Sequence, residues 1–403
     1  METATPPISG ARISSSSIKD AVDRISPILS QHVAEEEDSG RLSPTVVKAM
    51  RATGLFKLFL PKSLGGSEID PLTMAKLVEQ VGSHNTAAGW SLMVSNTTLL
   101  MLSRIPEEGV EEMFGNNPDA FIAGTVHPPM MATRTEGGYL INGRNPLVSN
   151  VHEANWIMVL ALVMEEGQPK MIEGHPVILA VYMDAKDCTI VNTWNVIGMR
   201  ATDSNDVEAI NVFVPDHRLC VVMPEFNPGR HFSGPLYKIP SACGNLACLL
   251  PPVTLAVARN AINELKTLAT RKTPLGSMVT IRERGVMQRK LGQAESLVEA
   301  SRAYLHQKID QCWQKILAGE IISLEEKAGL LLAATYTNQS CVQAVELMYT
   351  AAGSSGIYLK NKLAHHLADA QVLRQHGFMT ENRFETAGQV YFGLQPDLPI
   401  IEL

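Results

Sequence analysis

The chain has 403 residues, of which 45% are hydrophobic and 19% are charged, and its net charge is −7. This composition is typical of a globular protein with two or three subdomains, and the negative charge argues against nucleic acid as a partner. The six scattered cysteines fit reduced thiols in the cytoplasm better than disulfides or a zinc site. The longest apolar run, residues 156–164, is about half of the roughly 20 residues that a membrane span needs.

The N-terminal region has the pattern of a helical domain. One helix is expected from a cap at Ser43 to Gly54, and the next from a cap at Asp70 to Gly82. A third segment, residues 86–103, is almost entirely apolar. It is therefore expected to be a buried helix.

From residue 118 the hydrophobic period changes to two. Residues 132–150 alternate around a Gly-Gly pair, which predicts a β-hairpin. Further apolar runs follow at short spacing: 155–164, 175–184, 188–196 and 208–216. This spacing predicts a small antiparallel barrel or sandwich.

The C-terminal region returns to a helical period. Apolar residues at steps of three and four over 287–316 predict a helix roughly 45 Å long at ~1.5 Å per residue. A second helix is expected from a cap at Ser323 to Gly353. Helices of this length need bundle partners, so the fold class is α+β. The expected parts are a disordered N-terminus at 1–17, a helical domain at 18–117, a β domain at 118–232 and a helical bundle at 233–403.

The loop "GMRATDSNDV", residues 198–207, is small and polar. Gly198 would allow a close backbone approach, and Thr202 and Ser204 add hydroxyl groups that could contact a ligand. Local chemistry alone favours a plain turn between strands. The chain has neither a GxGxxG motif after a strand nor a P-loop, so a cofactor is expected to lie between domains.

Histidines and an aspartate cluster near the C-terminus. His365 and Asp369 are four residues apart and share one helix face. His376 lies about 16 Å further along a helix axis, so a single ion could not bind all three, and no metal is predicted. A solvated or satisfied pair is favoured for His365 and His366, although a two-ligand site completed from elsewhere stays open. His376 precedes Gly377 at an expected helix end, where an imidazole could exchange protons with a cavity.

Two further stretches could contribute to a site. The basic segment 270–290 contains Arg271 and Lys272 and is either a phosphate clamp or a solvated helix start. His127 and Ser149 could face inward from the β domain, although each alone would also fit a strand edge or a turn.

Taken in order along the chain, these stretches resemble the acyl-CoA dehydrogenase superfamily. "GMRATDSNDV" is similar to the Gly-Met-Arg-x-Thr-x-Ser loop that lies against the flavin ring in that family, and "LPKSLGGSEID" is similar to its early P…GG segment. The C-terminal "AAGSSGIYLKNKLAHHLADAQVLRQH" and "ETAGQVYFGLQPDLP" resemble the branch of two-component flavin monooxygenases. The resemblance extends over nearly the whole chain.

The resemblance implies a monooxygenase that uses reduced FMN or FAD from a separate flavin reductase. Such an enzyme hydroxylates a small aromatic or heteroatom-bearing substrate with O₂ through a C4a-hydroperoxyflavin, and the family assembles as homotetramers. His376 would assist proton transfer, Ser149 would hydrogen-bond near flavin N5, and His127 would contact the substrate or the flavin edge. The other implied contacts are Met199, Thr202 and Ser204 along the isoalloxazine, Arg271 or Lys272 at the phosphate across a subunit boundary, and Trp90 and Asn96 at the pocket wall.

The chain also departs from the pattern of this branch. Asn145 and Leu147 replace an aromatic pair, Asn150 replaces the closing glycine, and Ala368 replaces the arginine of an Arg-Asp pair. These departures support one alternative, a protein that has lost flavin and binds a metabolite or catalyses a non-redox step. The other alternative is an FAD-dependent acyl-CoA dehydrogenase, although Gly377 stands where those enzymes carry a glutamate base.

Overall fold

The computed structural model describes residues 15–115, 117–172, 174–222, 229–240, 248–398 and 401. The segment that was expected to be disordered, 1–17, lies almost entirely outside the described residues, which begin with helix α1. Within the described part of the chain, none of the helices combines the length and the apolarity that crossing a membrane requires.

The N-terminal region is helical, as expected. Its helices are α1 (Ser15–Gln31), α2 (Val33–Ser39), α3 (Pro44–Ala52), α4 (Pro71–His84), α5 (Thr86–Leu100) and α6 (Glu107–Phe114). Side chains of Ser43, Asp70 and Asn85 accept the capping hydrogen bonds of α3, α4 and α5. Helix α5 is buried along almost its whole length, which confirms the expectation from its apolar sequence.

Helix α4 does not end at Gly82, so that prediction was wrong by two residues. The helix continues to His84, and Gly82 is buried inside it. The glycine is needed for packing rather than for termination, because α4 and α5 approach closely there. A Cβ atom on Gly89 of α5 would lie 2.7 Å from the Cα of Gly82.

The central region is one sheet with the strand order β10-β7-β3-β1-β2-β9-β8. The strands in this order are β1 (Ile122–Thr135), β2 (Gly138–Val148), β3 (Trp156–Glu165), β7 (Ile178–Asp184), β8 (Thr189–Val191), β9 (Asn205–Pro215) and β10 (Leu219–Val221). Three short strands lie beside them: β4 (Gln168–Pro169) pairs with β3, and β5 (Met171–Ile172) pairs with β6 (His175–Pro176). The predicted hairpin is β1–β2, with Thr135 paired to Gly138.

Two details of the sheet differ from the expected antiparallel barrel or sandwich. The pairing path among the described strands stays open, and β1 pairs with β3 in parallel. An alternating pattern identifies strands but not their neighbours, so it could not reveal this pairing. The predicted strand 188–196 is also shorter, because the side chain of Asn205 accepts hydrogen bonds from the backbone N–H groups of Thr193 and Trp194.

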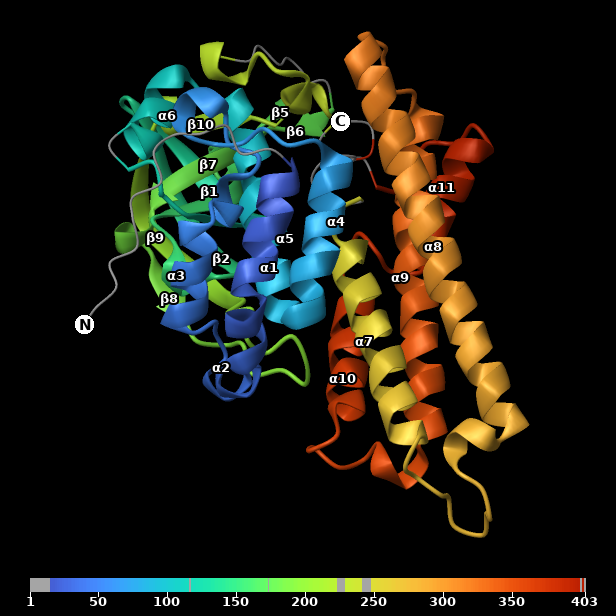
Figure 1. Ribbon diagram of the computed structural model, residues 1–403. Coiled ribbons are helices and arrows are strands. Elements are labelled where there is room, and N and C mark those ends of the chain that lie inside the picture. The colour runs from blue at the N-terminus through green and yellow to red at the C-terminus, as the bar shows by residue number, and fades with distance from the viewer. Residues whose placement is uncertain are drawn as a thin grey trace, which may run out of the picture.

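The C-terminal region is the expected helical bundle. It contains α7 (Pro251–Ala269), α8 (Gly285–Ala318), α9 (Leu324–Ala352), α10 (Lys362–Arg374) and α11 (Asn382–Tyr391). Helix α9 begins with a capping box at Ser323 and ends at Gly353, as predicted. Figure 1 shows the long helices α8 and α9 together with α7 and α10 on one side of the molecule, while the sheet and the N-terminal helices form the other.

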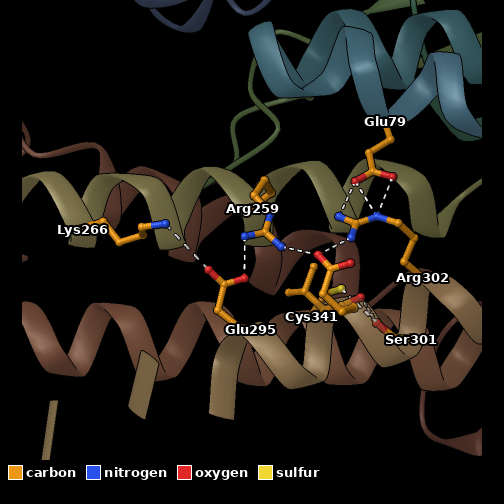
Figure 2. A network of polar contacts seen from close by, with 9 residues as sticks. Glu79, Arg259, Lys266, Glu295, Ser301, Arg302 and Cys341 are labelled. Carbon is orange, nitrogen blue, oxygen red and sulfur yellow. Dashed lines mark hydrogen bonds and ion pairs between the residues drawn. The ribbon is translucent and has the colours of Figure 1, made fainter. Parts of the chain in front are cut away.

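A network of charged side chains connects the N-terminal helices to the bundle (Figure 2). Arg302 of α8 donates hydrogen bonds to both carboxylate oxygens of Glu79 in α4, at 2.7–3.1 Å, and to Glu299 at 2.5 Å. Arg259 of α7 donates to Glu295 at 2.6 Å and to Glu299 at 2.5 Å. The network thereby ties three helices from two regions of the sequence together.

Replacing Arg302 with methionine should destabilise the protein. The side chains of Arg302 and Glu79 are 20% and 18% exposed, so the variant leaves a largely buried carboxylate without its partner. We expect a loss of about 1–3 kcal/mol in the free energy of unfolding, below the roughly 3–5 kcal/mol of a fully buried pair. Urea denaturation would measure this loss. The matched control is Arg134→Met, because Arg134 pairs with Asp216 at the surface, and an equal loss in both variants would contradict the expectation.

His366 should make stability fall at acidic pH. Its side chain is 6% exposed, its Nδ1 atom has no hydrogen-bond partner among the described residues, and burial lowers its pKa to about 3. Below about pH 6.5 this histidine binds a proton in the unfolded chain but stays neutral in the folded chain. The contribution of His366 to the free energy of unfolding is therefore fully present near neutral pH and decreases as pH falls. Between pH 7.5 and 5 this group alone accounts for about 2 kcal/mol. His366→Gln should reduce that pH dependence in urea denaturation, whereas the same change at the exposed His175 should not.

Candidate functional site

A cavity of about 710 Å³ lies where the sheet, helix α5 and the end of helix α10 meet. This volume is within the range of sites that hold a cofactor or a drug-sized ligand. Its lining is mainly apolar: Met93, Val94, Met101, Val126, Leu147, Met158, Val196, Ile197, Leu250, Val372, Leu373 and Phe378. The predicted site residues Trp90, Ser149, Met199, Thr202, Ser204 and His376 also line it.

A chain of hydrogen bonds crosses one wall of this cavity. The indole N–H of Trp90 donates to Ser149 Oγ at 3.0 Å, Ser149 Oγ lies 2.8 Å from Ser204 Oγ, and Ser204 Oγ lies 2.8 Å from Thr202 Oγ1. The Thr202 hydroxyl donates to the carbonyl oxygen of Met199 at 2.9 Å. These residues are far apart in sequence, and α5, the end of β2 and the loop before β9 bring them together.

The two ends of this chain fix the direction of every hydrogen bond in it. An indole nitrogen can only donate, and a carbonyl oxygen can only accept. Because the hydrogen of Thr202 is used on Met199, Ser204 donates to Thr202 and Ser149 donates to Ser204. Each hydroxyl hydrogen is therefore committed inside the chain. Ser149 keeps one free lone pair, so it can accept a further hydrogen bond from a ligand.

The loop that carries Met199 is fastened at its backbone. The N–H of Met199 donates to Asp369 Oδ1 at 2.6 Å, and its carbonyl oxygen accepts from the indole N–H of Trp194 at 3.1 Å. Met199 has a φ of 54°, a left-handed conformation that is uncommon for a residue with a side chain. Gly198 allows the loop to touch helix α10, because a Cβ atom there would lie 2.5 Å from the backbone nitrogen of Asp369 and closer still to the carbonyl group of Ala368.

His376 follows the last turn of helix α10 and faces the indole of Trp90, with the ring centroids 5.6 Å apart. The backbone N–H of Phe378 donates to Nδ1 at 3.4 Å, which assigns the ring hydrogen to Nε2. Burial lowers the pKa of His376 to about 4, so the ring is neutral at pH 7. The cavity wall thus contains one neutral imidazole that holds a proton at Nε2.

Asn96, which was expected near the pocket wall, is not among the described residues that line the cavity. Its side chain is fully buried and donates hydrogen bonds to the carbonyl oxygens of Leu55 and Leu92 at 2.8 Å. Its amide oxygen accepts from the N–H of Phe59 at 3.0 Å. Asn96 therefore fastens α5 to the segment after α3, because a buried amide must satisfy both its donors and its acceptor.

The basic pair and His127 are placed differently from the other site residues. Lys272 donates to the carbonyl oxygen of Ala352 at 2.6 Å, and neither it nor the exposed Arg271 lines the cavity. Their expected contact with a flavin phosphate crosses a subunit boundary, so it stays a prediction. The side chain of His127 lies outside the described part of the structure.

Asn145 and Leu147 of β2, which depart from the pattern of the monooxygenase branch, have different consequences. Leu147 lines the cavity and has a φ of 63°, at a point where the register between β2 and β9 shifts. An aliphatic side chain there leaves more room than an aromatic one would. Asn145 is fully buried, and neither atom of its amide group has a partner among the described residues. The structure gives no physical reason for an asparagine at this position.

Some of the residues that line the cavity, among them Trp194 and Phe378, were not predicted from the sequence. Trp194 was assigned to a strand, because residues 188–196 have an apolar pattern. Its position four residues before Gly198 was the available signal, and in the structure its indole N–H bonds to the carbonyl oxygen of Met199 in that loop.

Comparisons with known proteins place this geometry in context. Residues 17–113 match the family described as acyl-CoA dehydrogenase, N-terminal domain, and residues 249–381 match acyl-CoA dehydrogenase, C-terminal domain. An indole-3-acetate monooxygenase from Acinetobacter baumannii is 29% identical over 363 residues, which cover 90% of each protein.

Two further proteins resemble the chain along almost its full length. The oxygenase subunit HsaA of a flavin-dependent monooxygenase from Rhodococcus jostii is 24% identical over 93% of this chain and 97% of its own. XiaF from a Streptomyces species, solved in complex with FADH2 and glycerol, superposes with a TM-score of 0.87 at 23% identity. That superposition covers 96% of this chain and 97% of XiaF, and it shows that the two share a fold.

Proposed function

Because the chain belongs to the acyl-CoA dehydrogenase superfamily, and its relatives there are flavin-dependent monooxygenases, we propose that it is the oxygenase component of a two-component flavin monooxygenase. The family, fold class, enzyme class and flavin cofactor expected from the sequence motifs agree with these comparisons. HsaA is named as an oxygenase subunit, so a separate reductase would deliver the reduced flavin to this chain as well.

The observation that carries this proposal is the direction of the hydrogen-bond chain at Ser149. Reduced flavin bears a hydrogen on N5, whereas oxidised flavin does not. Ser149 donates to Ser204 and keeps only acceptor capacity toward the cavity, so it suits the N–H of the reduced form. The neighbouring Met199, Thr202 and Ser204 would lie along the isoalloxazine.

When bound, the reduced flavin supplies two electrons that activate O₂ for transfer of one oxygen atom. The residues of the chain provide the surroundings for that chemistry. His376 holds a proton at Nε2 beside the site, and the apolar walls exclude water that would release the oxygen as hydrogen peroxide. His376 and the apolar side chains line the same cavity, so substrate and flavin would meet there.

We propose a neutral aromatic substrate. Apolar side chains make up most of the lining, and none of the described lining residues is Lys, Arg, Asp or Glu. The segments 223–228 and 241–247, which lie outside the described residues, contain no Lys or Arg either. A buried carboxylate without a cationic partner is costly, so a neutral ring should bind better than a ring that bears an acetate group.

The same lining argues against an acyl-CoA dehydrogenase. That reaction requires a carboxylate base beside the thioester, and the described lining offers none. The imidazole of His376 lines the cavity, stays neutral at pH 7 and bears its hydrogen at Nε2, which suits a hydrogen-bond donor better than a base.

We further propose that the chain assembles as a homotetramer. Large apolar side chains are exposed at the ends of the bundle helices and in the loops beside them: Leu275, Met278, Ile321, Leu359, Phe392 and Leu394. Burial of such side chains against other copies of the chain would remove them from water. Light scattering should give four times the chain mass, and a monomer would contradict this part of the proposal.

The proposal is tested by oxygen incorporation. The protein would be mixed with FMN or FAD kept reduced by a flavin reductase, isotopically labelled O₂, and either indole or indole-3-acetate. We expect one labelled oxygen atom in the product and faster turnover of the neutral ring. The proposal would be contradicted if hydrogen peroxide were the only product with both indole and indole-3-acetate. Electron transfer from octanoyl-CoA to an acceptor dye would favour the dehydrogenase instead.

A further inference from the structure

A cluster of three ionisable side chains lies directly behind the cofactor loop. His365 Nε2 is 2.5 Å from Glu37 Oε1 and 3.3 Å from Asp369 Oδ2. Glu37 belongs to α2 and the other two to α10, so the cluster joins helices that are more than 300 residues apart in sequence. The sequence had suggested a solvated or satisfied histidine here, and the structure shows a histidine placed between two carboxylates.

Asp369 connects this cluster to the cavity. It is 2% exposed, and its Oδ1 accepts the N–H of Met199 at 2.6 Å. The hydroxyl of Thr86, at the start of α5, also donates to this carboxylate. Asp369 therefore holds the loop whose Met199 carbonyl terminates the hydrogen-bond chain from Trp90.

We infer that His365 is a positioning residue: its Nε2 group lies between Glu37 and Asp369, keeps the Asp369 carboxylate fixed on the Met199 N–H and thereby holds the flavin loop in its binding conformation. The part of this inference that concerns flavin rests on the proposed function, whereas the anchoring of the loop does not. His365 and Asp369 are four residues apart on α10, so both side chains lie on one face of the helix.

The carboxylates of the cluster are partly or fully buried. Burial raises the pKa of both Glu37 and Asp369. Other charged groups act on the cluster: Arg200 of the loop attracts Glu37, Asp38 of α2 repels it, and Lys362 lies on α10. His366 lies beside His365, with ring centroids 5.8 Å apart, and its lowered pKa keeps it neutral, so it supplies no charge.

Two measurements on the full chain test this inference. The first is hydrogen exchange of the flavin-free protein in the peptide that contains Met199, and the second is the Kd for reduced FMN or FAD. The variants are His365→Ala, which removes the contact with both carboxylates, and His365→Gln, which keeps an N–H donor at this position. The control is His175→Ala at an exposed histidine in strand β6.

We expect His365→Ala to raise the Kd for reduced flavin by roughly fivefold, as the loss of one partly buried polar contact allows, and to speed hydrogen exchange at Met199. His365→Gln should restore part of both properties, and His175→Ala should change neither. An exchange rate at Met199 that is unchanged in His365→Ala would overturn the anchoring. A wild-type protein that binds no reduced flavin, with faster exchange in His365→Ala, would refute the proposed function and leave the anchor standing.

Discussion

Replacing His376 with alanine should reduce substrate oxygenation by roughly 100-fold or more, the range of rate that is lost when one preorganised hydrogen-bond donor is removed. The imidazole lines the cavity and holds its proton at Nε2, and burial keeps it neutral at pH 7. The apolar wall offers no substitute, since the hydroxyl hydrogens of Ser149, Ser204 and Thr202 are all used within their own chain. The variant should therefore still bind flavin but consume O₂ mainly as hydrogen peroxide.

A second variant keeps a hydrogen-bond donor at this position. His376→Asn has an N–H group but no imidazole ring, so its rate should lie between those of the wild type and the alanine variant. The Kd for reduced flavin, measured without O₂, should change by only a few fold in both variants. Unchanged turnover in His376→Ala would show that the imidazole has no part in the reaction. His175→Ala, far from the cavity lining, serves as the control.

Replacing Gly198 with alanine should abolish tight flavin binding. The added Cβ would lie 2.5 Å from the backbone nitrogen of Asp369 and closer to the carbonyl group of Ala368. Backbone atoms cannot rotate away as a side chain can, so either the loop or helix α10 has to move. A shift of the loop breaks the contact between Met199 and Asp369, and a shift of the helix displaces His376.

We expect Gly198→Ala to weaken reduced-flavin binding at least about tenfold and to lower the free energy of unfolding by about 1–3 kcal/mol, as overpacking does. Gly388→Ala is the matched control, because Gly388 lies in helix α11 with open space around it. That change should leave flavin binding intact and stabilise the protein by about 0.5–1 kcal/mol. Normal flavin affinity in Gly198→Ala would mean that the close approach of loop and helix is not required.

Local signals in the sequence were sufficient for most helices and for part of the site. Ser43, Asp70 and Ser323 each cap a helix through a bond that reaches only three residues along the chain, so the sequence alone locates it. The loop with Thr202 and Ser204 could be identified in the same way, because a run of small polar residues before a strand is visible without the fold.

Contacts between distant segments could not be predicted. The parallel pairing of β1 with β3 leaves no mark in an alternating pattern, and the bond from Met199 to Asp369 joins positions 170 residues apart. The resemblance implied a place near the pocket wall for Asn96, whereas its partners are buried backbone groups of another segment. Whether such a side chain is buried, and which groups it forms hydrogen bonds with, is decided only when helices from separate regions pack together.

The flavin affinity of the two redox states tests the central claim most directly. Reduced and oxidised FMN and FAD would be titrated under anaerobic conditions into the wild type and into Ser149→Ala, which removes the acceptor for the N5 hydrogen. We expect the wild type to bind one reduced flavin per chain and to bind the oxidised form more weakly, and we expect Ser149→Ala to lose most of that difference. No saturable binding of reduced flavin, or equal affinities for the two states in the wild type, would contradict the claim that this cavity is built for reduced flavin.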